Sequence, residues 1–198
     1  CEYINVKEIK MFKRIIAFSL IILILAGNVF AFYDDIAEFE EFEMIETVAN
    51  YDNLILNSKN AILYDNTYDK ILFEKNAYEK VPNASTTKVL TAIVAFEKGN
   101  LKDIVTVGKN AALIGGSGIN LRTDDKISLE DLIKGLLVHS GNDAAVAIAE
   151  HIGGSVENFC KMMNQKAKEI GCLDSNFVNA NGAHSDNHYS TAYDLAMI

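Results

Sequence analysis

The stretch that decides the fold is residues 82–88, Pro-Asn-Ala-Ser-Thr-Thr-Lys, which leads directly into the apolar run Val-Leu-Thr-Ala-Ile-Val-Ala-Phe. A polar turn after a proline, followed by an apolar-rich run, predicts a helix that begins near Ser85. Ser85 and Lys88 are three residues apart and therefore share a face of that helix. A hydroxyl at a helix N-terminus beside an amine that can take its proton is a candidate activated nucleophile. A plain helix cap followed by a surface lysine is the simpler interpretation of these two residues alone.

Outward from this stretch, the sequence predicts a mixed α/β architecture. Two short strands, 61–64 and 71–74, flank a polar hairpin turn, and a further strand is expected at 103–107. The helix after Ser85 should end at Gly99. Later helices are expected at about 128–138, 143–151, 155–170 and 190–198, separated by turns and by a polar loop at 172–189. The loop 115–118, Gly-Gly-Ser-Gly, lacks the Gly-Lys-Ser/Thr that a phosphate-binding loop needs.

Length and composition indicate one globular domain. The chain has 198 residues, 49% of them hydrophobic and 23% charged, which is enough for a real core. The formal net charge is -9, and no basic patch points to a nucleic acid partner. Much of the negative charge lies in residues 34–46, which contain acidic side chains and no basic one.

The first 31 residues have the pattern of an export signal. A positive segment with Lys10, Lys13 and Arg14 precedes an apolar run. Small residues at the −3 and −1 positions of Val29-Phe30-Ala31 favour cleavage after Ala31. An uncleaved membrane anchor is the alternative. Either way, the remainder is expected outside the cytoplasmic membrane. We therefore divide the chain into a leader and signal peptide (1–31), an acidic linker (32–54) and a folded domain (55–198).

A second candidate site lies in a turn between two apolar helices. Ser140, Gly141 and Asn142 can project a hydroxyl and a carboxamide into a cleft while the flanking helices stay buried. The same three residue types are also good turn formers, so by themselves they indicate only a helix break.

Together, the two stretches resemble the serine-type D-alanyl-D-alanine carboxypeptidases, which are low-molecular-mass penicillin-binding proteins with Ser-x-x-Lys, Ser-x-Asn and Lys-Thr-Gly motifs. The likeness covers roughly residues 55–198 and includes the blocks 84–92, 127–145 and 188–196. It implies the transpeptidase fold shared by penicillin-binding proteins and serine β-lactamases, with a helical part and an antiparallel sheet that is incomplete in this chain. Residues 55–198 would be the N-terminal portion of the catalytic domain.

The resemblance also implies a reaction and a role for each residue. Such an enzyme removes the terminal D-alanine from peptidoglycan stem pentapeptides through a serine acyl-enzyme, without a cofactor or metal, and β-lactams acylate the same serine. Ser85 would be the nucleophile, Lys88 its general base and Ser140 the proton relay. Asn142 would bind the substrate's backbone amide and help to orient Lys88. The Ser85 N–H would donate an oxyanion bond worth about 3 kcal/mol.

One expected motif is absent. No Lys-Thr-Gly, Lys-Ser-Gly or His-Thr-Gly occurs in the sequence, whereas the resemblance implies such a motif on a strand beyond the 188–196 block. We therefore expect a truncated form of the enzyme, without most of its sheet, its second oxyanion donor and the cation for the substrate carboxylate. A fragment of this kind should expose apolar helix faces and be inactive alone.

Several other patterns in the sequence could indicate a different site. Residues 185–187 read Ser-Asp-Asn but lie in a polar loop, so Ser140 and Asn142 are preferred. His184 and His188 suggest a metal pair only if that loop were helical. His139 and His151 are expected to pack or cap helices. Cys160 and Cys172 are expected to be free thiols, with a disulfide left open.

Two other functions remain as alternatives. A β-lactamase of the same fold would need a Glu-x-x-x-Asn loop motif, which neither Glu157 nor Glu169 starts. An exported, non-catalytic remnant that binds peptidoglycan is the second. Membrane association is left open for every one of these readings.

Overall fold

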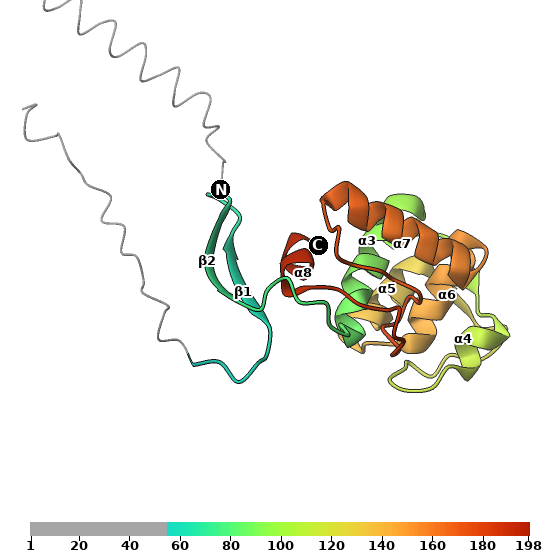
Figure 1. Cartoon of the computed structure of the whole chain (residues 1–198). Coiled ribbons are helices and arrows are strands. Elements are labelled where there is room, and N and C mark those ends of the chain that lie inside the picture. The colour runs from blue at the N-terminus through green and yellow to red at the C-terminus, as the bar shows by residue number, and fades with distance from the viewer. Residues whose placement is uncertain (1–54) are drawn as a thin grey trace, which may run out of the picture. The chain divides into compact units, whose positions relative to one another are not determined.

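The computed structural model describes residues 55–198; the expected signal peptide and acidic linker lie outside this range. The described part begins with a hairpin of β1 (Ala61–Asp65) and β2 (Lys70–Lys75), paired antiparallel as predicted (Figure 1). The Asp65 carboxylate accepts the backbone N–H groups of Thr67 and Tyr68. An aspartate that bonds the backbone two residues ahead favours a turn, which is why the chain reverses here.

Four helices form the body that follows: α3 (Thr87–Lys98), α5 (Leu129–Val138), α6 (Asn142–Gly153) and α7 (Val156–Ile170) (Figure 1). Helix α6 is the central one, since it contacts the other three and the short α4 (Lys109–Leu113). Its residues 144–149, Ala-Ala-Val-Ala-Ile-Ala, are all buried. The burial predicted from this apolar run is confirmed, and its small side chains let several helices approach at once.

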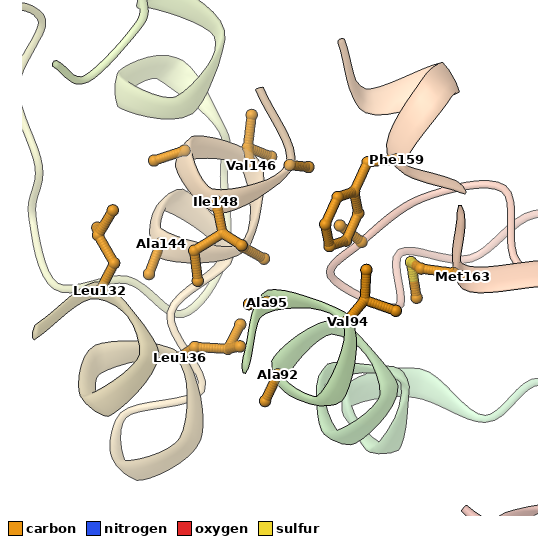
Figure 2. Packing of buried hydrophobic residues seen from close by; sticks show 14 of the residues in the cluster. Ala92, Val94, Ala95, Leu132, Leu136, Ala144, Val146, Ile148, Phe159 and Met163 are labelled. Atoms are coloured by element: carbon orange, nitrogen blue, oxygen red, sulfur yellow. The ribbon is translucent and has the colours of Figure 1, made fainter. Parts of the chain in front are cut away.

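The hydrophobic core lies where these four helices meet. Figure 2 shows Val94 of α3 pointing toward Phe159 and Met163 of α7, and Ile148 of α6 and Leu136 of α5 belong to the same cluster. Each of these five side chains exposes 1% of its surface or less. Burying a side chain of this size is worth about 1.5–3 kcal/mol, so this contact holds the helices in place.

Side-chain caps set the helix starts that the sequence predicts. The hydroxyls of Ser128, Ser155 and Thr191 accept the N–H three residues ahead at the starts of α5, α7 and α8 (Ala192–Met197). At the other end of α7, Gly171 has φ +99° and stops the helix as expected. Local sequence chemistry thus fixes most boundaries of the helical body.

Two short elements were not predicted. Helix α4 and strand β4 (Lys126–Ser128) are too short to show a periodic pattern of apolar residues. Strand β4 pairs antiparallel with β3 (Ile104–Thr106). Residues 55–198 therefore contain two small antiparallel sheets rather than one broad one. Within that same range, no helix has the length and apolar character that a membrane crossing requires.

Candidate active site

Ser85 lies in a tight 3₁₀ turn, η2 (Ala84–Thr86), immediately before α3. The predicted helix start is therefore a turn followed by a helix that begins at Thr87. The first hydrogen bond of the turn comes from the Thr86 N–H to the Asn83 carbonyl, so the Ser85 N–H lies ahead of it. Ala84 has φ +44°, a left-handed conformation that costs a non-glycine residue roughly 1–2 kcal/mol. This strained turn presents Ser85 at the surface.

Lys88 is buried, with 3% of its surface exposed. Its Nζ donates to the Ser85 Oγ at 3.0 Å and to the Asn181 carbonyl at 2.7 Å. Burial lowers the pKa of the Lys88 amine from its ordinary value, because the charged form loses its hydration. A neutral Nζ at this distance can accept the Ser85 proton, so the geometry suits a general base.

Ser140 lies at the turn between α5 and α6 and also reaches the nucleophile. Its Oγ donates to the Ser85 Oγ at 3.1 Å, across 55 residues of sequence. Ser140 has φ +54°, so the turn is held in a left-handed conformation at the serine itself. The structure thus brings together Ser85, Lys88 and Ser140, the three residues predicted to perform the chemistry.

Asn142 begins α6 and is tied to the loop 115–118. Its Nδ2 donates to the Gly115 carbonyl at 2.8 Å, and its backbone N–H donates to the Ser117 carbonyl at 2.7 Å. The Lys88 Nζ donates to Ser85 and to the Asn181 carbonyl, and the orienting role expected of Asn142 toward Lys88 stays a prediction. With Nδ2 engaged, the Asn142 Oδ1 is the carboxamide atom that can accept a hydrogen bond from a substrate amide.

Asp143 was not predicted from the sequence as a site residue, yet it holds the loop 115–121 against the start of α6. Its carboxylate is buried and accepts the backbone N–H groups of Ile119, Leu121 and Ala144 at 2.9–3.1 Å. These bonds fix the loop 115–121 against the start of α6, beside Asn142. The available signal was an acidic residue in the first turn of an otherwise apolar helix.

A second set of residues missed by sequence reasoning runs along α3. The carbonyl of Ala180 accepts the Thr91 hydroxyl at 2.7 Å, and the next carbonyl, that of Asn181, accepts Lys88. Gly182 follows and lies against the peptide bond between Ala84 and Ser85. The segment 180–182 therefore lines α3 from its second turn back to the nucleophile. Its polar composition predicted a loop but not this contact.

The competing patterns take other positions. In the loop 185–187, the Ser185 carbonyl and hydroxyl accept the N–H groups of His188 and Asn187, which is ordinary turn bonding. His184 is exposed and 3.9 Å from the Asp186 carboxylate, whereas His188 is buried. Over residues 55–198, no group of three or more His, Cys, Asp or Glu side chains could hold a metal ion.

The other two histidines of residues 55–198, and the two cysteines there, lie outside the candidate site's hydrogen bonds. His139 is the C-terminal cap residue of α5, and His151 in the last turn of α6 lies 3.3 Å from Asp103. Cys160 and Cys172 are buried free thiols, so the disulfide left open by the sequence is not formed. Burial raises the pKa of each thiol to about 11.

The chain is similar to known proteins in sequence and in fold. A family model described as D-alanyl-D-alanine carboxypeptidase matches residues 46–198. Over 146 residues the chain is 41% identical to D-alanyl-D-alanine carboxypeptidase DacF of Bacillus subtilis (strain 168), an alignment that covers 71% of this chain and 38% of that protein. Over 191 residues it is 35% identical to DacC of Escherichia coli (strain K12), covering 91% of this chain and 46% of that protein.

A solved structure extends the likeness to three dimensions. The crystal structure of D-alanyl-D-alanine carboxypeptidase DacD from Francisella tularensis matches with a TM-score of 0.69 at 36% identity, covering 73% of this chain and 36% of that one. This chain thus spans less than half the length of the three proteins compared. The family match includes Ser85, Lys88, Ser140 and Asn142. The chain belongs to the D-alanyl-D-alanine carboxypeptidase family.

Proposed function

We propose that this protein is a serine D,D-carboxypeptidase that removes the terminal D-alanine from peptidoglycan stem pentapeptides. The observation that carries the proposal is the position of the Ser85 Oγ, which lies 3.0 Å from Lys88 Nζ and 3.1 Å from Ser140 Oγ. A hydroxyl between a buried amine and a second hydroxyl has a base to take its proton and a relay to pass it on. Membership of the family supports the substrate class.

The acylation step follows from this arrangement. Neutral Lys88 takes the Ser85 proton while the Oγ bonds to the carbonyl carbon of the penultimate D-alanine. The Ser85 N–H donates to the developing oxyanion. The carbon–nitrogen bond then breaks, and a proton passed through Ser140 converts the leaving nitrogen to the free amine of D-alanine. Water hydrolyses the resulting ester, which releases the shortened peptide and restores the Ser85 hydroxyl.

Asn142 would orient the substrate peptide. Its Oδ1 can accept a backbone N–H of the substrate, because the Gly115 carbonyl already holds the Nδ2. A β-lactam, which mimics the D-alanyl-D-alanine terminus, should acylate Ser85 by the same route.

The proposal also includes a location. A signal segment at residues 1–31 would export the domain to the outer side of the cytoplasmic membrane, where peptidoglycan lies. Retention of that segment as an anchor would leave the protein associated with the membrane. Fractionation of cells that express the full-length protein, with and without residues 1–31, tests this part: exclusive recovery in the cytoplasm would refute it.

Labelling with a fluorescent penicillin tests the activity. The full-length protein, meaning residues 1–198 together with any sequence that follows them in the complete gene product, should form a stable covalent label, and Ser85→Ala should lose it. Ser185→Ala, which alters the competing Ser-Asp-Asn sequence, is the matched control and should label normally. Release of D-alanine from a peptide that ends in D-alanyl-D-alanine should follow the same pattern. Rapid turnover of the antibiotic would indicate a β-lactamase instead, and no label at all would indicate a non-catalytic binding protein.

A further inference from the structure

A buried imidazole next to the site has no part in the mechanism above. His188 exposes 2% of its surface, and both of its ring nitrogens have partners. Its Nδ1 lies 3.1 Å from the Val178 backbone nitrogen, and its Nε2 lies 2.8 Å from the Thr87 Oγ1. Because a backbone N–H can only donate, Nδ1 is unprotonated and the neutral ring carries its hydrogen on Nε2. His188 therefore donates to Thr87. Burial lowers the pKa of this imidazole, in agreement with a neutral ring.

Thr87 links His188 to the η2 turn, which carries Ser85. Its side chain is fully buried, and its Oγ1 also lies 2.9 Å from the Asn83 Nδ2, which donates to it. Asn83 precedes η2 and Thr87 follows it, so the two residues flank the turn that carries Ser85. We call the hydrogen-bonded series His188–Thr87–Asn83 the His188 brace.

The turn inside the brace needs external support. Ala84, between Asn83 and Ser85, has the left-handed φ of +44°, a conformation that persists only where surrounding structure holds it. Asn83 is itself held at a cost, since within residues 55–198 its Oδ1 is buried and has no hydrogen-bond partner. Its remaining side-chain bond, to Thr87, keeps it in place.

The far end of the brace is anchored in the helical body. The imidazole stands edge-on to the Phe177 ring, with centroids 5.7 Å apart and planes at 85°. The Phe177 backbone is bonded twice to Asn164 of α7, whose Oδ1 accepts its N–H and whose Nδ2 donates to its carbonyl, both at 2.8 Å. A rigid path therefore runs from α7 through His188 to the turn.

We propose that His188 is a positioning residue for acylation: through Thr87 and Asn83 it holds the η2 turn in the conformation that places the Ser85 Oγ between Lys88 and Ser140. This inference rests on the proposed serine acylation. Displacing a reacting atom by about 1 Å can lower a rate roughly 100-fold. Loss of the brace should therefore slow bond formation while leaving the initial, noncovalent binding of the substrate nearly intact.

The test mixes the full-length protein rapidly with a fluorescent penicillin at several concentrations. The time courses give the dissociation constant of the noncovalent complex and the acylation rate constant separately. Thr87→Val keeps the shape of the side chain but removes the hydroxyl, and His188→Leu removes the donor. Each should lower the acylation rate constant by about 10- to 100-fold, with little change in the dissociation constant. Their combination should be no slower than the slower single variant, because both break one bonded series.

His188→Gln supplies the rescue. A glutamine carboxamide offers an acceptor for Val178 and a donor for Thr87, so its acylation rate constant should return close to that of the unsubstituted protein. Thermal unfolding of each variant reports on folding, and Thr87→Val keeps the test valid if His188→Leu does not fold. Normal acylation by Thr87→Val, additive losses in the double variant, or a Gln variant as slow as Leu would overturn the proposal. Failure of the unsubstituted protein to label would overturn the proposed function, and this inference with it.

Discussion

Gly182 lies so close to Ala84 that a Cβ atom on Gly182 would stand 1.9 Å from the Ala84 carbonyl oxygen and 3.0 Å from the Ser85 nitrogen. Glycine is needed at position 182 for two reasons. A side chain would collide with Ala84, and the φ of +84° is unfavourable for other residues. The backbone of the segment 180–182 is thus in direct contact with the peptide bond whose N–H would serve the oxyanion. The nucleophile turn is shaped by a loop that lies about 100 residues later in the sequence.

We predict that Gly182→Ala slows the acylation of Ser85 even in the fraction of the protein that remains folded. The added methyl group must displace the Ala84–Ser85 peptide, and with it the Ser85 N–H and Oγ. Labelling by fluorescent penicillin should slow by at least about 10-fold, and the melting temperature should fall.

Gly154→Ala is the matched control for that prediction. Gly154 also has a positive φ, +69°, but an added Cβ there meets nothing within 4 Å. This variant should lose about 1–2 kcal/mol from backbone strain alone and keep its labelling rate. Equal labelling by the two variants would show that the contact with Ala84 is unimportant.

We predict that acylation speeds up as pH rises through the lowered pKa of Lys88. Only neutral Lys88 can take the Ser85 proton, and burial lowers the pKa of that amine, so the active fraction grows with pH until the amine is fully deprotonated. Measuring the acylation rate constant against pH, with circular dichroism to confirm that the fold is unchanged, checks this. A rate that stays flat or falls with pH from acidic solution, where the amine is protonated, up to its unperturbed pKa would exclude Lys88 as the base.

The lowered pKa of Lys88 also makes the free energy of unfolding depend on pH. Since the folded-state pKa of Lys88 is lowered, the unfolded chain binds more protons between that pKa and the unperturbed value of about 10.4. The free energy of unfolding contributed by Lys88 should therefore rise with pH across this window. In Lys88→Met this component should vanish from denaturant titrations made at several pH values; an unchanged pH dependence would contradict the assignment.

We predict that Asp143→Ala is strongly destabilising. The change leaves the N–H groups of Ile119, Leu121 and Ala144 without their buried acceptor, at a cost of roughly 2–4 kcal/mol. Urea unfolding measures the loss. Asp131→Ala removes an exposed acid from the first turn of the neighbouring helix α5 and should have a much smaller effect. Comparable losses in the two variants would refute the anchoring role of Asp143.

We predict that Cys160 and Cys172 resist thiol reagents in the folded protein. Both are buried, and each has its pKa raised to about 11, so only about one thiol in a thousand is ionised at pH 8. Peptide mapping after alkylation should find these two residues unmodified in native buffer and fully modified in denaturant. Fast modification in native buffer would show that the helices around them open readily.

The sequence by itself determined most of the longer helices, the first hairpin, and the Ser85–Lys88 pair of this protein. Helix caps such as Ser128 and Ser155, stop signals such as Gly171, and apolar periodicity act over a few residues, so they can be read locally. Ser85 and Lys88 also belong to this class, because a spacing of three residues is one turn of the chain. The two side chains meet even though Ser85 lies in the η2 turn and Lys88 in α3.

The tertiary structure alone decided how those residues are held. The approach of Ser140 to Ser85 across 55 residues was expected only from a resemblance, and the geometry supplies the distance. The contacts of Asn181 with Lys88, Gly182 with Ala84 and His188 with Thr87 had no local signal. Each joins segments about 90 to 100 residues apart, and such pairings depend on how packed helices bring loops together, which no short window of sequence contains.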